Sequence, residues 1–453
     1  MKCAIRSSLL VACLAVFAGP VWPQQAKTDT VRPPKLDIQT HTLENGLRIV
    51  LLEDHAVPVI NLQMWYHVGS KDEQPGRTGF AHLFEHLMFK GSAHVGPDEH
   101  SRLIEAIGGY DNAYTNDDVT VFWETFPSNY LERVIWLEAD RMGSLNVDQV
   151  NFASEREVVK EERRLRVDNR PYGLIQEDLY AAAFTVHGYH HTTIGSMDDL
   201  NKAKLEDVRE FFKTFYRPNN ATMVIVGDFN PQEALNWARK YFDGISRSSS
   251  GSIPRLTAKE PPQTEERVIR KSYSNTPLPA VVEGFKMPAK YALDSYPLEL
   301  AANILAGGES SRLYQTLVYR DRIAVAAAGF GNFTEDPNLF WVYAVMNQGH
   351  TAEEGENGVS VVLEGLKTQP VEAAELDKSK NQEISSSILG RQTDQEKGDA
   401  IGAAAVVGKD PGLVNTELAR YLNVTVADIQ RVAKEYFTKE RATVLVVTTQ
   451  AAK

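Results

Sequence analysis

"GFAHLFEHLMFKGS" (Gly79–Ser92) sets two histidines and a glutamate among large apolar side chains. At about 100° per residue, His82, Glu85 and His86 fall together on one face of a helix. The opposite face collects the large apolar side chains Phe80, Leu83, Phe84, Leu87 and Met88. The pattern predicts an amphipathic helix that buries one face in a core and presents three polar groups on the other.

The spacing of the two histidines suits a metal ion. On a helix, residues four apart have Cβ atoms about 5–6 Å from each other, so both imidazoles can reach one ion. Glu85 points into the same space without having to bind the metal. The order His-x-x-Glu-His reverses the zinc motif His-Glu-x-x-His. Taken alone, the pattern fits two solvated surface histidines equally well, so a distant carboxylate must decide between the two interpretations.

A second helical stretch offers that carboxylate. In "NFASEREVVKEERRLRVDNRPYG" (Asn151–Gly173), Glu155 and Glu162 lie about 20° apart on a face shared with Val158 and Val159. A carboxylate on an inward face needs a positive partner, which could be a core arginine or a metal. The remaining glutamates of the stretch fall on the opposite, solvated face, namely Glu157 and Glu161.

The two stretches together favour a metal. His82, His86 and Glu162 make a His₂Glu set, which recurs at catalytic zinc sites with water at the fourth position. Glu85, beside the metal but free, could serve as general base for that water. Glu155, one helical repeat from Glu162, is expected to support the ligands rather than bind the metal itself.

The N-terminus differs in composition from the rest of the 453 residues. Lys2 and Arg6 precede an apolar run, Leu9–Ala18, and residues 1–23 are expected to be a cleaved secretory signal. Both cysteines lie in this segment, which leaves a mature chain without thiols and predicts a periplasmic or secreted location. No later run is apolar and long enough to suggest a membrane span. The net charge of −12, without a basic stripe, argues against a nucleic-acid partner.

The chain divides into two similar halves. Ser246–Thr264 is rich in Ser, Pro and Gly and is expected to link a domain of residues 24–245 to one of residues 265–453. Near the end of each half, Leu205–Asp228 and Val426–Thr449 share one pattern at an offset of 221 residues. Each has an amphipathic helix, a polar turn, Ala-Thr and an apolar strand. We expect a duplicated α+β domain, in which helices pack on an antiparallel-rich sheet.

His-x-x-Glu-His followed 76 residues later by the last Glu of "EREVVKEE" (Glu155–Glu162) resembles the pitrilysin-type (M16, inverzincin) zinc metallopeptidases. That family includes mitochondrial processing peptidase. The resemblance also covers "LENGLRIVLLEDHAVPVINLQMWYHVGSKDE" (Leu43–Glu73) as an opening hairpin. It implies a clamshell half of the LuxS/MPP-like metallohydrolase type with one Zn²⁺ per chain. His82, His86 and Glu162 would then bind the zinc, with Glu85 as the base.

The resemblance identifies "GGYDNAYTNDDVTVF" (Gly108–Phe122) as the edge strand of the active site. Asn112 and Ala113 match the positions that hold the substrate backbone in the family. An open strand edge can pair with an extended peptide through main-chain hydrogen bonds, whereas the plain alternative is an ordinary edge strand. "HGYHH" (His187–His191) is expected to be a solvated loop.

The C-terminal half departs from the family pattern. In "GGESSRLYQTLVYRDRIAVAAAGF" (Gly307–Phe330), Val318 and Val325 stand where the family carries an Arg and a Tyr that reach the bound peptide. Losing such donors typically costs about 10²–10³ in rate. Tyr319 and Arg320 lie near but at the wrong spacing. We expect a zinc endopeptidase subunit for short or unfolded peptides, whose partner is a homologous chain that supplies the Arg/Tyr pair. The alternative is a non-catalytic peptide-binding or assembly subunit that retains a metal site.

Overall fold

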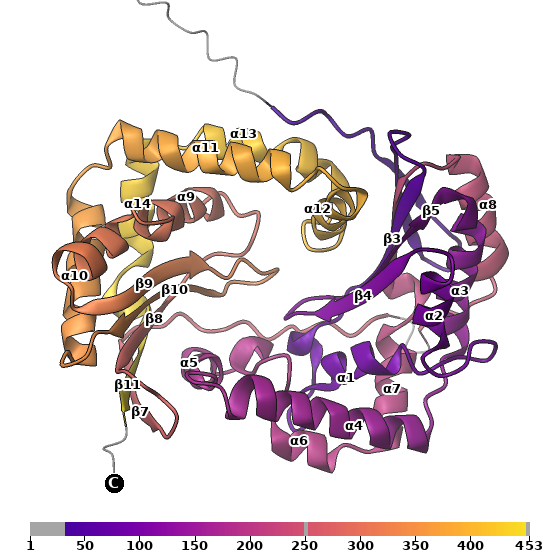
Figure 1. Ribbon diagram of the computed structural model, residues 1–453, viewed down its shortest axis with the longest axis horizontal. Coiled ribbons are helices and arrows are strands. Elements are labelled where there is room, and N and C mark those ends of the chain that lie inside the picture. Colours follow the sequence, from indigo (N-terminus) through magenta and orange to yellow (C-terminus); the bar gives the residue numbers. More distant parts are fainter. Residues whose placement is uncertain (1–31, 249–251, 450–453) are drawn as a thin grey trace, which may run out of the picture. The chain divides into compact units, whose positions relative to one another are not determined.

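Two antiparallel-rich sheets form the framework of the chain (Figure 1). The computed structural model describes residues 32–248 and 252–449, so the expected signal segment, with both cysteines, lies outside the described residues. The first sheet has the order β1-β2-β6-β3-β5-β4, in which β2 and β6 pair in parallel and the other neighbours pair antiparallel. Its strands are β1 Gln39–Thr42, β2 Arg48–Glu53, β3 Val59–Tyr66, β4 Tyr110–Thr115, β5 Thr120–Pro127 and β6 Ala221–Gly227.

The second sheet repeats this topology without the first strand. Its order is β7-β11-β8-β10-β9, with β7 and β11 parallel and the other neighbours antiparallel. Strands β6 and β11, which end the two repeated blocks, therefore occupy the same position in the two sheets. The expected duplication of an α+β domain is confirmed. The strands are β7 Arg267–Tyr273, β8 Ala280–Lys286, β9 Ala324–Gly331, β10 Leu339–Met346 and β11 Ala442–Thr449.

Helices surround both sheets. The sequence block with the His-x-x-Glu-His motif forms α1, and the glutamate-rich stretch forms α4, which lies against α1 (Figure 1). In the N-terminal half the helices are α1 Phe80–Leu87, α2 Glu99–Glu105, α3 Leu131–Ser144, α4 Gln149–Arg163, α5 Ile175–Ala183, α6 Met197–Lys202, α7 Leu205–Phe215 and α8 Pro231–Phe242. In the C-terminal half they are α9 Ser295–Ala306, α10 Ala352–Thr368, α11 Ala373–Leu389, α12 Asp394–Val406, α13 Glu417–Leu422 and α14 Val426–Tyr436.

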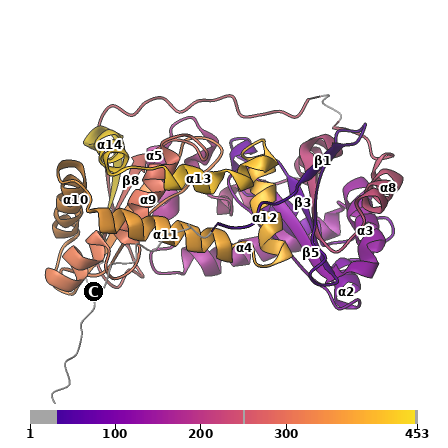
Figure 2. The same cartoon turned by 90° about the horizontal axis from the view of Figure 1, so that it is seen from above.

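Both faces of the first sheet are buried. Alternate residues of β2 point to opposite sides, so Ile49 enters one core with α1, α3, α7 and α8, while Val50 enters another. The second core is closed by α12, which comes from the C-terminal half and packs on β3 and β6 (Figure 2). This explains why β2, β3 and β6 are buried at nearly every position, including the polar Asn61 and Gln63 on the face of β3 toward α12.

A buried ionic cluster ties the two halves together. Lys71 Nζ lies 2.8 Å from Asp118 Oδ1 and 2.8 Å from Glu335 Oε2, and 3.0 Å from Asp336 Oδ2. The β4–β5 turn holds Asp118, whereas Glu335 and Asp336 belong to the loop between β9 and β10. The Glu335 backbone N–H also donates to Asp118 Oδ2 at 2.8 Å. We name Lys71, Asp118, Glu335 and Asp336 the interdomain clasp.

Two sequence expectations are wrong in detail. "HGYHH" is not a solvated loop, because His187 and Tyr189 are buried and the Tyr189 hydroxyl donates to Asp118 at 2.5 Å. Val158 does not share the inward face of α4, since 46% of it is exposed. The buried stripe of that helix is narrower and consists of Phe152, Glu155, Val159 and Arg163.

Residues 252–264, which precede β7, have neither helix nor strand (Figure 2). Within the described residues, no helix combines the length and the apolar character that crossing a membrane requires.

Candidate metal centre

Helix α1 is fixed at its N-terminus by a carboxylate. The buried Glu73 accepts hydrogen bonds from the backbone N–H of Gly79 at 2.8 Å and of Ala81 at 2.7 Å. The carboxyl oxygens thus satisfy amide groups of the first turn that have no partner within the helix. Gly79 has a φ of 91°, and an added Cβ would lie 2.8 Å from the Ile194 carbonyl oxygen, so the turn into the helix requires glycine. Sequence analysis missed Glu73, which stands outside the motif.

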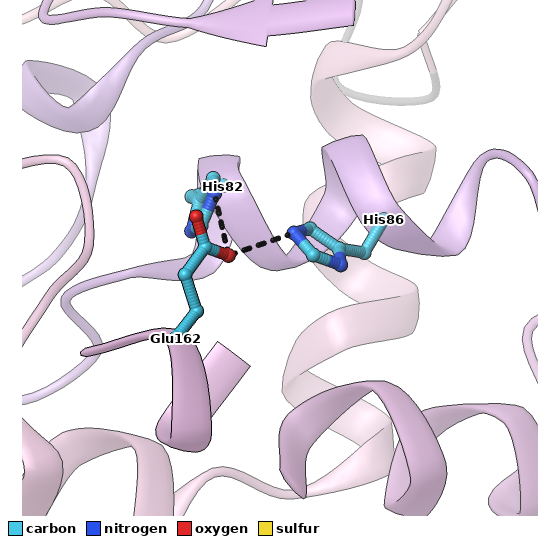
Figure 3. Close-up of side chains that lie close together, drawn as sticks. All are labelled: His82, His86 and Glu162. Carbon is cyan, nitrogen blue, oxygen red and sulfur yellow. Dashed lines mark ion pairs between the residues drawn. The ribbon is translucent and has the colours of Figure 1, made fainter. Parts of the chain in front are cut away.

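The three candidate ligands converge. Glu162 Oε2 lies 3.6 Å from His82 Nε2 and 3.3 Å from His86 Nε2, and Figure 3 shows the carboxylate directed at both rings. One donor atom from each residue lies within 4.8 Å of the others. Two imidazoles and one carboxylate form a donor set that suits Zn²⁺, so the residues present fit the metal that the sequence predicts.

Neighbouring side chains hold this set in place. Glu155 Oε2 lies 3.4 Å from His86 Nδ1, and its other oxygen lies 3.2 Å from Lys90 Nζ. Contact with the second ring nitrogen of a histidine orients the ring and selects the tautomer. Glu155 thus contacts the candidate ligand His86, in the supporting position expected of it. Arg166, on the π-helical turn Arg164–Asp168, lies 2.7 Å from Glu162 Oε1, a contact that sequence analysis missed.

Glu85 stands beside the ligands. Its Oε2 accepts a hydrogen bond from the Thr115 hydroxyl at 2.6 Å, which orients the carboxylate from the end of β4. Burial raises the pKa of Glu85 above its usual value, and the Thr115 hydrogen bond opposes this in part. A carboxylate with a raised pKa is a stronger base than one in water, and general bases act best with a pKa near the working pH.

The charge balance of the metal-free cluster also fits a cation. Burial, with the neighbouring His86, lowers the pKa of His82 to about 4. Burial alone would lower the pKa of His86 too, but hydrogen bonds with Glu155 and Glu162 raise it to about 9. The cluster therefore holds one proton near neutral pH. A divalent cation would displace that proton and use the imidazole lone pairs.

A cavity of about 740 Å³, which we name the metal cavity, opens around His82, His86 and Glu162. The middle and end of β4 form one wall, from Asn112 to Thr115. Strand β4 is the edge of the first sheet. The Ala113 backbone N–H donates to Asn112 Oδ1 at 2.8 Å, a side chain of its own strand, so this amide faces away from β5. Asn112 and Ala113 thus lie at the cavity, and at least one main-chain donor faces the open edge.

A second cluster of metal-ligand types has a different explanation. His100, Glu124 and Glu138 lie together in the core of the first domain. The guanidinium of Arg141 lies among them, with Nε 3.0 Å from Glu138 Oε2 and Nη2 3.1 Å from Glu124 Oε1. The guanidinium occupies the space between the two carboxylates and balances the charge of one, while burial raises the pKa of Glu138 to about 8, so the cluster is an ion-pair network rather than a metal site.

Comparison with known proteins identifies the family. The model described as Insulinase (Peptidase family M16) matches residues 48–196, and the one described as Peptidase M16 inactive domain matches residues 202–383. Zinc protease PqqE of Helicobacter pylori is 32% identical over 403 residues, which cover 89% of this chain and 90% of that protein. The chain belongs to peptidase family M16.

Other M16 proteins agree in fold and sequence. A crystal structure of a protease from Helicobacter pylori has a TM-score of 0.88 at 31% identity, over 92% of this chain and 100% of that chain. A probable mitochondrial-processing peptidase beta subunit of Arabidopsis thaliana is 25% identical over 313 residues, 67% of this chain and 58% of that protein. The His-x-x-Glu-His motif and Glu162 both lie within the residues matched by the Insulinase model.

The M16 positions expected to carry an Arg and a Tyr do not line the metal cavity of this chain. Val318, on the π-helical turn Tyr314–Arg320, packs partly against the core of the second domain. Val325 lies on β9 and is 49% exposed. The nearby Arg320 is exposed and pairs with the adjacent Asp321 at 2.8 Å. Neither valine can donate a hydrogen bond from its side chain.

Proposed function

We propose that this chain is a zinc endopeptidase subunit that hydrolyses short or unfolded peptides. The observation that carries the proposal is the convergence of His82, His86 and Glu162 from two helices, with Glu85 beside them. A His₂Glu donor set leaves a fourth position open, which is the arrangement of catalytic rather than structural zinc. Its membership of M16 and its similarity to proteins named zinc proteases support one Zn²⁺ at this set.

The residues divide the chemistry between them. Zn²⁺ at His82, His86 and Glu162 would polarise the scissile carbonyl and make water more acidic. Glu85 takes a proton from the attacking water and delivers it to the amide nitrogen as the C–N bond breaks. Thr115 holds Glu85 in the orientation for this transfer, through its 2.6 Å hydrogen bond.

The edge of β4 aligns the peptide. An extended substrate adds to the open side of β4 as a further strand, with the Ala113 N–H as one of its donors. Main-chain pairing requires an unfolded segment and makes little demand on sequence. In the free chain, Asn112 Oδ1 accepts the hydrogen bond that a substrate carbonyl would accept from the Ala113 N–H. Asn112 must therefore release the Ala113 N–H when the substrate binds.

A partner chain and an extracytoplasmic location complete the proposal. Val318 and Val325 leave the transition state without the C-terminal donors, so a homologous M16 chain with the Arg/Tyr pair would form a heterodimer with this one. Similarity to mitochondrial-processing peptidase beta subunits is consistent with work in pairs. The signal-like composition of residues 1–23 supports a periplasmic or secreted enzyme.

Glu85→Gln tests the proposal. The amide keeps an acceptor for Thr115 but cannot accept the proton, so we expect cleavage of a quenched fluorescent peptide to fall by at least about 10²-fold. Zinc content, measured by mass spectrometry, should stay unchanged. Glu161→Gln, on the solvated side of α4, is the matched control and should cleave normally. Unchanged cleavage by Glu85→Gln would eliminate Glu85 as the base.

The same assay separates the second candidate function, a non-catalytic peptide-binding or assembly subunit, which the two valines favour. Each form is assayed alone and with a homologous chain that carries the Arg/Tyr pair. Cleavage that requires both chains and the Glu85 carboxylate supports the heterodimeric peptidase. Zinc and peptide binding without cleavage in either assay supports the alternative.

A further inference from the structure

A second cavity, of about 660 Å³, adjoins the metal cavity and shares Arg166, Val167, Gly173 and Gln176 with it. The two cavities therefore lie on either side of the same four residues. We name the second cavity the aromatic groove, because its lining includes Tyr172, Tyr180, Phe330, Trp341 and Tyr343.

We propose that the aromatic groove binds an aromatic side chain of the peptide substrate, next to an acidic residue, at a position away from the scissile bond. This inference rests on the proposed peptidase function and names the substrate class of the same site. Binding in the aromatic groove makes the chain selective among peptides that pair equally well with β4.

Phe330 gives the groove an exposed apolar surface. It lies on β9, and 47% of it is exposed although it is a large apolar side chain. Its ring stacks on Trp341 with centroids 5.9 Å apart and planes inclined by 8°. Tyr343 follows on the same face of β10, two residues further along that strand. The buried Trp341 ring supports Phe330 from one side, and the exposed part of Phe330 is a surface on which a further ring can stack.

The wall between the two cavities is rigid. Tyr172 has a φ of 62°, a left-handed conformation that is unfavourable for tyrosine and persists where its surroundings enforce it. Its hydroxyl donates to the Leu278 carbonyl oxygen at 2.8 Å, which fixes the ring across the domain boundary. At Gly173 an added Cβ would lie 2.1 Å from the Val167 carbonyl oxygen, so the two backbone segments pack too closely there for any residue with a side chain.

Two arginines give the groove its charge. Arg166 pairs with Glu162 at 2.7 Å, whereas the exposed Arg170 side chain forms no ion pair or hydrogen bond with the described residues. The Arg170 guanidinium is thus available to a ligand of the groove. It would attract a carboxylate of the peptide and place it beside the rings. The groove is therefore matched to an aromatic residue with an acidic neighbour.

The test measures binding without turnover, in the Glu85→Gln chain loaded with zinc. Fluorescein-labelled ten-residue peptides would carry Phe-Asp, Ala-Asp or Phe-Asn at one position scanned along an otherwise constant sequence. At one position we expect Phe-Asp to bind about tenfold more tightly than Ala-Asp by fluorescence anisotropy. Phe330→Ser should abolish that difference, and Arg170→Gln should abolish the difference between Phe-Asp and Phe-Asn.

Leu293→Ser is the control, because Leu293 is 83% exposed and lies outside the groove. This variant should keep both preferences. Equal binding of the three peptides at every position, or equal effects of Phe330→Ser and Leu293→Ser, would overturn the proposal. The proposal would also be overturned if Phe330→Ser changed the association state of the chain but left peptide binding unaltered. That result would make the surface around Phe330 an interface between chains. Because this test compares the binding of peptides, its failure is distinguishable from a failure of the cleavage test of Glu85→Gln.

Discussion

His100 shows how one buried side chain can set the response of the fold to pH. It is 3% exposed, and its Nε2 lies 3.2 Å from Glu124 Oε1. Burial, with the positive charge of Arg141, lowers its pKa from 6.5 to about 4 although Glu138 attracts the proton. Between these two pH values the unfolded chain carries a proton on His100 that the folded chain lacks. Stability must therefore fall as the pH is lowered through this range.

Replacing His100 tests this linkage. We expect the free energy of unfolding of the native chain to fall by about 2 kcal/mol more than that of His100→Gln between pH 7 and pH 5. Urea titrations followed by tryptophan fluorescence at the two pH values measure the difference. His94→Gln is the control, because that ring is largely exposed. Parallel losses in the native chain and His100→Gln would contradict the linkage.

Helical geometry made part of the candidate metal centre predictable at this scale. The angles about α1 and α4 direct His82, His86 and Glu162 toward one another, and the structure brings these side chains together, because residues on regular helices follow the helical repeat. Glu73 and Arg166 could not be found in this way. Glu73 belongs to an irregular segment, and Arg166 lies on a π-helical turn, where the angle per residue changes. Their contacts depend on how the chain folds back on itself.

Strand β4 is the element that we propose aligns the peptide. Ala113→Pro removes the N–H that faces the open edge, and an edge strand tolerates proline where no partner strand is waiting. We expect the KM for peptides to rise about tenfold with a smaller change in kcat, as one main-chain hydrogen bond to the substrate is lost.

Ala113→Ser keeps the amide and serves as the control in steady-state assays of the same peptide. Circular dichroism and zinc content should match the native chain in both variants. An unchanged KM in Ala113→Pro would show that the peptide does not pair with β4 at this residue.

The periodicity of the sequence predicted whether a segment forms a helix or a strand better than it predicted what that element packs against. The repeated blocks predicted α7 with β6 and α14 with β11, because each block carries its own helix and strand signals. The position of α12 against β3 and β6 could not be predicted, since nothing near Asp394–Val406 in the sequence indicates which sheet it covers. The same applies to Val158, whose exposure depends on how narrow a stripe α4 presents to α1.

At the scale of the molecule, the interdomain clasp holds the two domains in one arrangement. Lys71 is 5% exposed, and Asp118 and Glu335 raise its pKa well above the usual value despite the opposing effect of burial. Lys71→Met leaves the buried Asp118 carboxylate without its cation and removes a charge partner from Glu335 and Asp336. We expect the free energy of unfolding to fall by about 3–5 kcal/mol, measured by urea titration.

Lys409→Met is the matched control for the clasp. Lys409 lies 3.3 Å from the same carboxylate, Glu335, but its side chain is 74% exposed. An exposed pair contributes about 0–1 kcal/mol, so this variant should be nearly as stable as the native chain. Equal losses in the two lysine variants would show that burial of Lys71 adds nothing to its role.

Helix α12 gives the duplicated architecture a further property. Its Gly402 approaches Trp65 so closely that an added Cβ would lie 2.1 Å from the indole, and Ile401 and Ala405 fill the space around it. Part of the core of the first domain is thus supplied by a helix from the C-terminal half. The first domain therefore completes its second core only with a helix from the other half, although the two halves share one topology. A recombination event that exchanges one half between related proteins must therefore preserve the fit between Trp65 and Gly402.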